Sequence, residues 1–252
     1  MTNAQKVKAL IESIETGDHG PIEYINPQKY IQHNLGAADG LAGFAEVLGH
    51  LPPGSARAEV IRVFEDGEFV FAHTDYNFFG PKAAFDIFRF ENGLIVEHWD
   101  NMGEKVEKTA SGRTQLDGPT AAADLDKTAA NKALIQKLFD RVLFGHHMDE
   151  LGSYFDGDKY PQHNVGVADG LSSLGKAMHD WAAAGTPMTF SKLHKVLAQG
   201  NFVLTVADGS FQGRTSAFYD LWRIENGKVA EHWDVIEAIP PKAEWKNQNG
   251  KF

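Results

Sequence analysis

Cysteine is absent from this chain of 252 residues. Its absence excludes disulfides, thiolate nucleophiles and thiolate metal sites, so any chemistry must use histidine, aspartate, glutamate or tyrosine. Basic residues are few relative to acidic ones, since 24 lysines and arginines against 34 aspartates and glutamates give a formal net charge of −10. Nucleic acids and anionic membranes attract basic surfaces, so this charge argues against either as a partner.

Long apolar runs are also missing. No stretch of roughly 18 apolar residues is available to cross a bilayer, and residues 1–10 (MTNAQKVKAL) lack the apolar centre of a signal peptide. With 42% hydrophobic and 23% charged residues, the composition is typical of a globular protein. We therefore expect a cytoplasmic protein without a membrane partner.

Two segments of the chain occur twice. Residues 32–41 (QHNLGAADGL) return as 162–171 (QHNVGVADGL), and residues 89–100 (RFENGLIVEHWD) return as 223–234 (RIENGKVAEHWD). The period of about 130 residues is far longer than the 20 to 50 residues of solenoid repeats, so the repeated unit is a whole domain. The sequence predicts two tandem domains, at residues 1–118 and 119–252, each long enough to bury its own core.

Within each copy, helical patterns precede strand patterns. Helices are predicted over residues 6–16 and 39–51, and over 128–144 and 169–184 in the second copy. Strands rich in Val, Ile, Phe and Tyr follow, with turn signals at residues 66–67, 79–81, 92–93, 199–200, 212–213 and 226–227. The predicted fold class is α+β, with N-terminal helices packed on a curved antiparallel sheet in each of two domains. Residues 117–127 are small and polar, as expected of a linker.

Three polar residues recur at matching places, and they are the candidate catalytic residues: His33, Asp86 and His98 in the first copy, and His163, Asp220 and His232 in the second. Asp86 lies within an aromatic strand, residues 85–90 (FDIFRF). Burial there would raise the pKa of the carboxyl group towards the range useful for a general base. In the alternative interpretation, Asp86 faces solvent or pairs with an arginine that holds the sheet together.

The turn at residues 92–93 decides whether Asp86 and His98 meet. A two-residue turn pairs Asp86 with Trp99 and leaves His98 on the opposite face of the sheet. A three-residue loop that includes Glu91 places Asp86 directly across from His98, about 5 Å apart at Cβ. We favour the three-residue loop.

Two further histidines are candidate ligand-binding residues. His73 is matched by Val206 in the second copy, which instead has His194 where the first copy has Ile61. With a three-residue loop at residues 65–67, Ile61 and His73 share a face, so that His194 could replace His73 from the neighbouring strand; a two-residue turn would not allow this.

A metal site is the alternative use of these side chains. His33, His73, Asp86 and His98 have ligand types that suit zinc, iron or manganese. Their long spacing and the loss of His73 in the second copy argue against a metal, so we expect no metal and no cofactor. Other candidate ligand contacts are asparagines next to the histidines and strand aromatics that otherwise fill the core: Asn34, Asn164, Phe71, Phe88 and Trp222.

The repeated motifs resemble those of the SnoaL-like polyketide cyclase family, within the nuclear transport factor 2-like superfamily. They are Tyr-x-Gln-His-Asn, Ala-Asp-Gly, Gly-x-Phe-Val, Asp-x-x-Arg-x-Glu-Asn-Gly and Glu-His-Trp-Asp, and the resemblance covers both copies almost end to end. It implies two cone-shaped domains, each with a sheet folded around helices to enclose an apolar pocket, and an Asp/His acid–base pair that needs no cofactor. Because the usual member is a single domain that dimerises through its sheet, the resemblance also implies a pseudo-dimer within the chain or a homo-oligomer.

We therefore expect a cofactor-independent acid–base enzyme, of the aldol cyclase or isomerase type, that acts on a small apolar carbonyl compound. Asp86 and Asp220 would remove a proton next to the carbonyl, and the histidines at 33, 98, 163 and 232 would hydrogen-bond the enolate oxygen or return the proton. Two alternatives stay open, namely a non-catalytic ligand-binding or dimerisation module and a histidine-rich metal-dependent enzyme.

Overall fold

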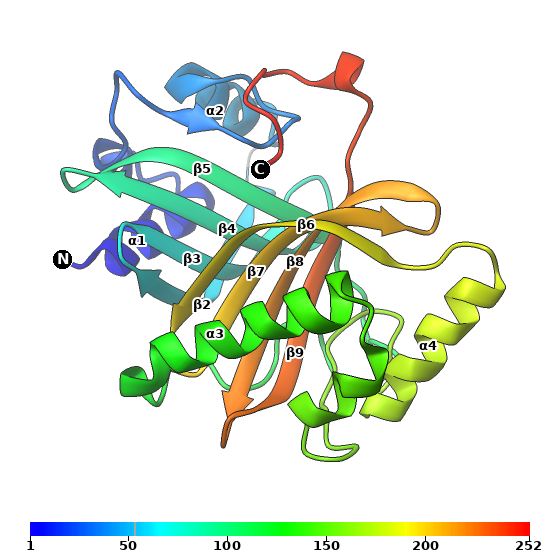
Figure 1. Ribbon diagram of the computed structural model, residues 1–252. Coiled ribbons are helices and arrows are strands. Elements are labelled where there is room, and N and C mark those ends of the chain that lie inside the picture. Colours follow the sequence, from blue (N-terminus) through cyan, green and yellow to red (C-terminus); the bar gives the residue numbers. More distant parts are fainter. Residues whose placement is uncertain (53) are drawn as a thin grey trace. The chain divides into compact units, whose positions relative to one another are not determined.

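The computed structural model describes residues 1–52 and 54–252, which form two compact units. Unit 1 comprises Met1–Lys105 and Ile239–Phe252, and unit 2 comprises Val106–Ala238. Each unit contains helices and one largely antiparallel sheet (Figure 1), which confirms the predicted α+β class with two copies of the fold. The predicted boundary at residue 118 describes the sequence repeat, whereas the segment after each sheet belongs to the compact unit of the other copy.

Unit 1 follows the predicted order of helices before strands. Its sheet has the order β1-β5-β4-β3-β2, in which the short β1 runs parallel to β5 and the other neighbours are antiparallel. Its elements are α1 (Asn3–Thr16), η1 (Gly20–Tyr24), β1 (Ile31–Gln32), α2 (Gly40–Gly49), β2 (Arg57–Asp66), β3 (Phe69–Asn77), β4 (Pro81–Glu91), β5 (Leu94–Glu104) and, near the end of the chain, η5 (Lys242–Glu244).

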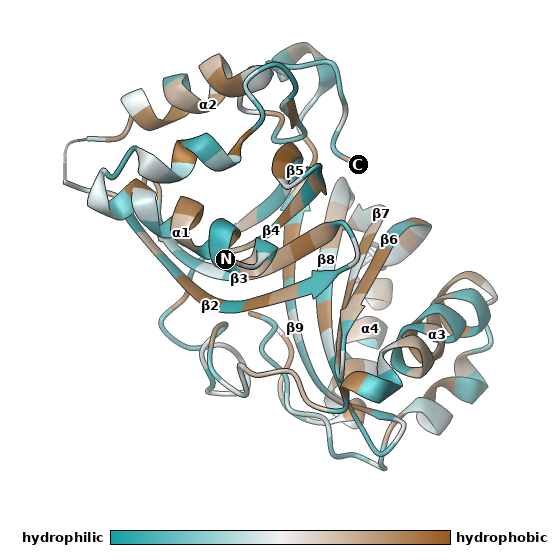
Figure 2. Ribbon diagram, turned by 90° about the vertical axis from the view of Figure 1, so that its left-hand side faces the viewer, coloured by the Kyte–Doolittle hydropathy of each residue, from teal (hydrophilic) through white to brown (hydrophobic). Residues whose placement is uncertain are grey.

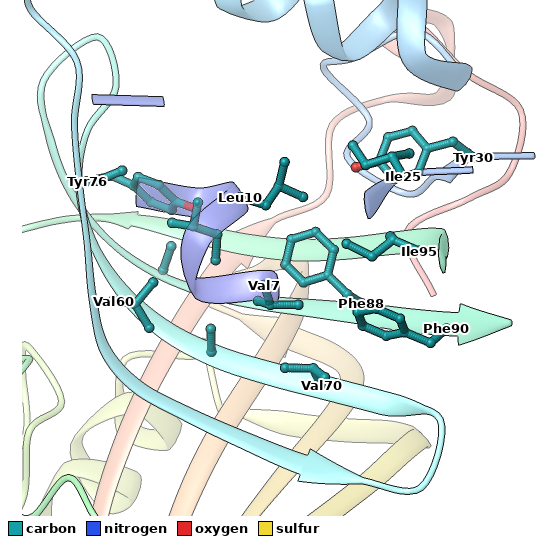
Figure 3. Packing of buried hydrophobic residues seen from close by; sticks show 14 residues of the cluster. Val7, Leu10, Ile25, Tyr30, Val60, Val70, Tyr76, Phe88, Phe90 and Ile95 are labelled. Carbon is teal, nitrogen blue, oxygen red and sulfur yellow. The ribbon is translucent and has the colours of Figure 1, made fainter. Parts of the chain in front are cut away.

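Helix α1 shows why these residues form a helix. Thr2 and Gln5 make a reciprocal capping box at its start, and Gly17, with φ of 70°, ends it in the left-handed conformation that glycine adopts without strain. The residues at spacings of three and four, among them Val7 and Leu10, are buried. Figure 3 shows them against apolar residues of the sheet, which form the core of unit 1.

In strand β2, Ala58, Val60, Arg62 and Phe64 are buried, and the residues between them are more exposed. A β-bulge between Val60 and Arg62 places these buried residues on both faces of the sheet, since Val60 pairs with Thr74 and Arg62 pairs with His73. Figure 2 shows the corresponding mixture of hydrophobic and hydrophilic residues along the strands of this sheet. The turn signals in both copies fall at hairpins, as predicted.

Unit 2 repeats the plan with the sheet order β6-β7-β8-β9. The helix predicted over residues 128–144 is α-helical to Leu138 and then continues as a π-helical segment. The elements are η2 (Leu125–Lys127), α3 (Thr128–Leu138), η3 (Phe139–Phe144), η4 (Met148–Tyr154), α4 (Leu171–Ala183), β6 (Thr189–Gln199), β7 (Phe202–Phe211), β8 (Arg214–Glu225) and β9 (Lys228–Ala238). In Figure 1, α3 lies across the strands of this sheet.

Across the described residues, no helix is both long and apolar enough to cross a membrane.

Candidate active site

Each unit encloses a pocket between one face of its sheet and its helices. The pocket of unit 1 has a free volume of ≈ 80 Å³ and that of unit 2 ≈ 60 Å³, so each has room for more than one water molecule. Apolar side chains form most of both linings. Besides tyrosine hydroxyls, the polar groups among them come from matching positions of the two copies: Gln32, Asn34, Asp86, His98 and Asp100 in unit 1, and Gln162, Asn164, Asp220, His232 and Asp234 in unit 2.

Asp86 is the central carboxylate of the first pocket and is only 4% exposed. Its Oδ1 lies 3.3 Å from Nε2 of His98, and its Oδ2 accepts hydrogen bonds from the hydroxyls of Thr74 (3.0 Å) and Tyr76 (3.1 Å). Burial raises the pKa of Asp86, although the hydrogen bond from His98 acts in the opposite direction. Burial together with Asp86 likewise raises the pKa of Tyr76.

The other nitrogen of His98 fixes where its proton lies. Nδ1 is 3.0 Å from Oε1 of Gln32, and this same oxygen accepts the backbone N–H of Asn34 at 2.8 Å, which identifies it as the amide oxygen. Nδ1 must therefore donate. Because Nε2 of His98 and Oδ1 of Asp86 would otherwise present two lone pairs to each other, one proton is shared between them. The two residues form an acid–base pair.

The same pair occurs in unit 2 with shorter contacts. Nδ1 of His232 lies 2.7 Å from Oε1 of Gln162, which also accepts the backbone N–H of Asn164, and Nε2 of His232 lies 3.1 Å from Oδ1 of Asp220. Gln162 and His232 form a parallel bridge that matches the pairing of β1 with β5 in unit 1.

A second carboxylate stands beside each pair. Asp100 lies directly opposite Asp86 in the sheet, and Asp234 lies opposite Asp220. An asparagine donates from Nδ2 to each of these second carboxylates at 2.5 Å, from Asn34 in unit 1 and from Asn164 in unit 2. Burial raises the pKa of Asp234 to about 6, and the negative charge of Asp220 adds to this rise.

The strand register differs from both alternatives derived from the sequence. The turn at Asn92 and Gly93 has two residues with φ of 52° and 79°, so the favoured three-residue loop is wrong. A β-bulge between Arg89 and Phe90 then shifts the pairing by one residue. Asp86 therefore lies opposite Asp100, and His98 is its diagonal neighbour on the same face, which still brings the pair together.

His33 and His163 do not line the described pockets, so a direct catalytic role for them is not supported. Nε2 of His33 lies 2.9 Å from Glu97, its Nδ1 lies 2.8 Å from the backbone oxygen of Gly250, and its ring stacks on Trp99. The side chain of a residue next to Gln32 in an extended segment points the other way, because side chains alternate along a strand. His33 thus acts in the structure of unit 1.

His163 has equivalent surroundings in unit 2. It lies 3.0 Å from Glu231 through Nε2 and 2.7 Å from the backbone oxygen of Thr114 through Nδ1. Burial alone would raise the pKa of Glu231, but hydrogen bonds from His163 and Arg223 outweigh it and hold this pKa below its ordinary value.

The other two candidate histidines lie away from the pockets. His73 is buried on the opposite face of the sheet, where its Nδ1 contacts Arg62 at 2.9 Å and its ring stacks on Phe85. His194 lies 3.5 Å from Asp208, and burial lowers its pKa although Asp208 opposes this. The hairpin between β2 and β3 has a two-residue turn, so the condition for His194 to replace His73 is not met.

The remaining ligand-binding candidates divide by face. Phe88 and Trp222 line the pockets of their units, as do Asn34 and Asn164. Phe71 does not line the first pocket and packs instead on Phe64, so its role in ligand binding stays a prediction that this pocket does not support.

The three-histidine metal set is not assembled, because His73 and His33 lie away from His98. The structure brings together a different set of metal-compatible ligands. One side-chain atom from each of Asp86, His98 and Asp100 lies within 4.8 Å of the others, and Asp220, His232 and Asp234 are arranged in the same way. The expectation that no metal is used stays a prediction.

Sequence reasoning missed Asp100 and Asp234, although a signal was present. Each lies two residues after the pocket histidine in the repeated Glu-His-Trp-Asp motif, and a strand places such residues on one face. Tyr76 and Thr74 had no such signal, because they have no counterparts in the second copy.

No protein-family model and no curated protein sequence matches the chain. Among solved structures, a candidate ketosteroid isomerase from Kribbella flavida matches with 18% identity and a TM-score of 0.38, covering 46% of this chain and 84% of its own. A SnoaL-like protein of unknown function from Burkholderia thailandensis matches with 13% identity and a TM-score of 0.35, covering 44% and 98%. A candidate polyketide cyclase from Streptomyces antibioticus matches with 19% identity and a TM-score of 0.33, covering 42% and 91%. One copy of the repeat at a time, the chain is similar to SnoaL-like, ketosteroid isomerase-like and polyketide cyclase-like structures.

Proposed function

We propose that the chain is a cofactor-independent acid–base enzyme that removes and returns a proton next to the carbonyl group of a small apolar compound. The observation that carries this proposal is the contact between a buried carboxylate and a histidine nitrogen in each pocket, 3.3 Å long in unit 1 and 3.1 Å long in unit 2. A group that holds one proton between two sites can accept another proton and return it without a metal or an organic cofactor.

The apolar lining supports the choice of substrate class. An anionic ligand would lose its hydration in these pockets without gaining a countercharge, because the described lining contains aspartates but no lysine or arginine. An uncharged carbonyl compound loses less, and its developing enolate is the charged species that the polar groups can stabilise.

The proton balance of the step follows from the pair. The C–H bond next to the carbonyl breaks, its electron pair forms the enolate, and the carboxylate of Asp86 or Asp220 takes the proton while His98 or His232 stays hydrogen-bonded to the other carboxylate oxygen. Returning that proton to the same carbon gives exchange, returning it to a different carbon gives isomerisation, and attack of the enolate on a second carbonyl gives an aldol product.

Deuterium exchange tests this proposal without knowledge of the natural product. Apolar cyclic ketones such as 2-tetralone would be incubated with the full-length protein in deuterated buffer, and loss of the proton signals next to the carbonyl would be followed by NMR. We expect exchange above the buffer rate and a loss of about 100-fold or more in a variant that carries both Asp86→Asn and Asp220→Asn. Unchanged exchange in that double variant would refute the proposal.

A further inference from the structure

The two pockets differ at the carboxylate that should take the proton. In unit 1, both oxygens of Asp86 are occupied, one by His98 and the other by Thr74 and Tyr76. In unit 2, Oδ1 of Asp220 contacts His232, whereas its Oδ2 is buried without a hydrogen-bond partner among the described residues.

The sheet register gives the reason for this difference. Ala72 pairs with Asp86 in unit 1, and Thr205 pairs with Asp220 in unit 2. Ala72 and Thr205 are therefore matching residues of β3 and β7. Two residues along these strands, Thr74 is matched by Ala207, and four residues along, Tyr76 is matched by Gly209. The second copy therefore has neither of the two hydroxyl groups that occupy Asp86.

The second carboxylates differ as well. Nζ of Lys251, which is 5% exposed, lies 3.8 Å from Oδ1 of Asp100 in unit 1. The backbone oxygen of Gly250 contacts Nδ1 of His33, and the backbone oxygen of Thr114 contacts Nδ1 of His163 in the same way. Gly250 and Thr114 therefore match each other. The next residue in each segment matches as well, so Gln115 in unit 2 corresponds to Lys251 in unit 1. A neutral amide thus stands in the second copy at the chain position of a lysine in the first.

The surroundings of the unpaired oxygen are strongly apolar. Large flexible and aromatic side chains make up much of the lining of the second pocket: Met148, Met178, Trp181, Met188, Phe190 and Trp222. A carboxylate oxygen without a partner in such a cavity gains from any donor that a ligand brings, because its desolvation is otherwise uncompensated. Methionine side chains adapt their shape readily, which suits an apolar ligand larger than the free volume.

We propose that proton transfer is concentrated in the pocket of unit 2, where Oδ2 of Asp220 is the base, and that the pocket of unit 1 mainly binds the ligand. This inference rests on the proposed function, because it assigns the same chemistry to one of two sites. For Asp86 to act as the base through Oδ2, the hydroxyls of Thr74 and Tyr76 must first release it. Asp220 has no such hydroxyls to release. The unit 2 pocket takes an apolar ketone whose acidic C–H bond points at this oxygen.

Single substitutions test the inference in the same exchange assay with 2-tetralone. We expect Asp220→Asn to lower exchange by about 100-fold or more, and Asp86→Asn to lower it by at least ten times less than that. The two changes are matched, since each replaces one carboxylate by its amide beside a histidine.

A second variant keeps Asp220 and gives its Oδ2 a hydrogen-bond donor. Ala207→Ser places a hydroxyl at the position that Thr74 has in unit 1, and we expect it to lower exchange by about tenfold through one new hydrogen bond to Asp220. Thermal melting of every variant shows whether a loss comes from unfolding.

The outcomes separate the inference from the proposed function. Equal losses in Asp220→Asn and Asp86→Asn, or a larger loss in Asp86→Asn, would overturn the inference and leave the proposed function standing. Full exchange in Ala207→Ser with a normal melting temperature would also count against it. Exchange at the buffer rate in the wild-type protein with all ketones tried would overturn the proposed function and the inference together.

Discussion

Asp234 makes the stability of the second unit dependent on pH. Its pKa is about 6 in the folded chain against 3.8 as the ordinary value, mainly because of burial. Below pH 3.8 both states are protonated, so the group has no effect. Between 3.8 and about 6 the unfolded chain loses its proton while the folded chain keeps it, so the free energy of unfolding falls as the pH rises. Above about pH 6 this loss is complete.

The magnitude follows from the same two values. Their difference corresponds to at most about 3 kcal/mol at neutral pH, and the partial exposure of Asp234 makes this an upper limit. Asp234→Asn removes the titrating group and keeps an oxygen that can accept the hydrogen bond from Asn164. We expect the variant to match the wild type near pH 4 and to be more stable by about 1–3 kcal/mol at pH 7.

Urea unfolding at a series of pH values from 4 to 8 measures this difference. Trp222 and Trp233 lie in the same unit and provide a fluorescence signal for its unfolding. The informative quantity is the difference between variant and wild type, because contributions from other titrating groups cancel. Two stability curves that run parallel from pH 4 to pH 7 would refute the reasoning about Asp234.

Two further predictions concern residues outside the pockets. His73→Ala leaves the buried guanidinium of Arg62 without one acceptor, so we expect urea unfolding to show a free energy of unfolding lower by about 2 kcal/mol. The folded variant should still exchange 2-tetralone like the wild type, and a strong loss of exchange in it would contradict this prediction. Asn249→Ala removes the hydrogen bonds that the Asn249 side chain donates to the backbone oxygen of Gln32 and to Asp39. We expect the free energy of unfolding of unit 1 to fall by about 1–2 kcal/mol and its melting temperature, measured by calorimetry, to fall by several degrees. An unchanged calorimetric profile would show that these bonds contribute little.

The sequence allowed the fold to be predicted because its signals are local. Helix spacing, glycine-containing turns and the order of elements lie within short windows of the chain. The β-bulge in the pairing of β4 with β5 has no local sequence signal. Its extra residue lies in the segment Leu94-Ile95-Val96 opposite Arg89 and Phe90, and this segment contains no glycine. The relation between Asp86 and His98 was therefore predicted with the wrong register, even though the two residues do lie together.

The site was predicted only in part, because the repeat identifies matching residues but not the direction in which they point. His33 recurs as faithfully as His98, yet it pairs with Glu97 away from the pocket. Gly250, whose backbone oxygen contacts His33, lies 217 residues further along the chain, and no local sequence pattern indicates such a contact.

The segments that follow the two sheets have changed places, which bears on how the duplication can be undone. Unit 1 is completed by Ile239–Phe252, and unit 2 begins at Val106, directly after the last strand of the first copy. If the gene were cut back to a single copy, the surviving sheet would keep only its own tail, which carries side chains suited to the other sheet, such as Gln115 in place of Lys251. A chain cut back to one copy would therefore reproduce neither unit as it stands here.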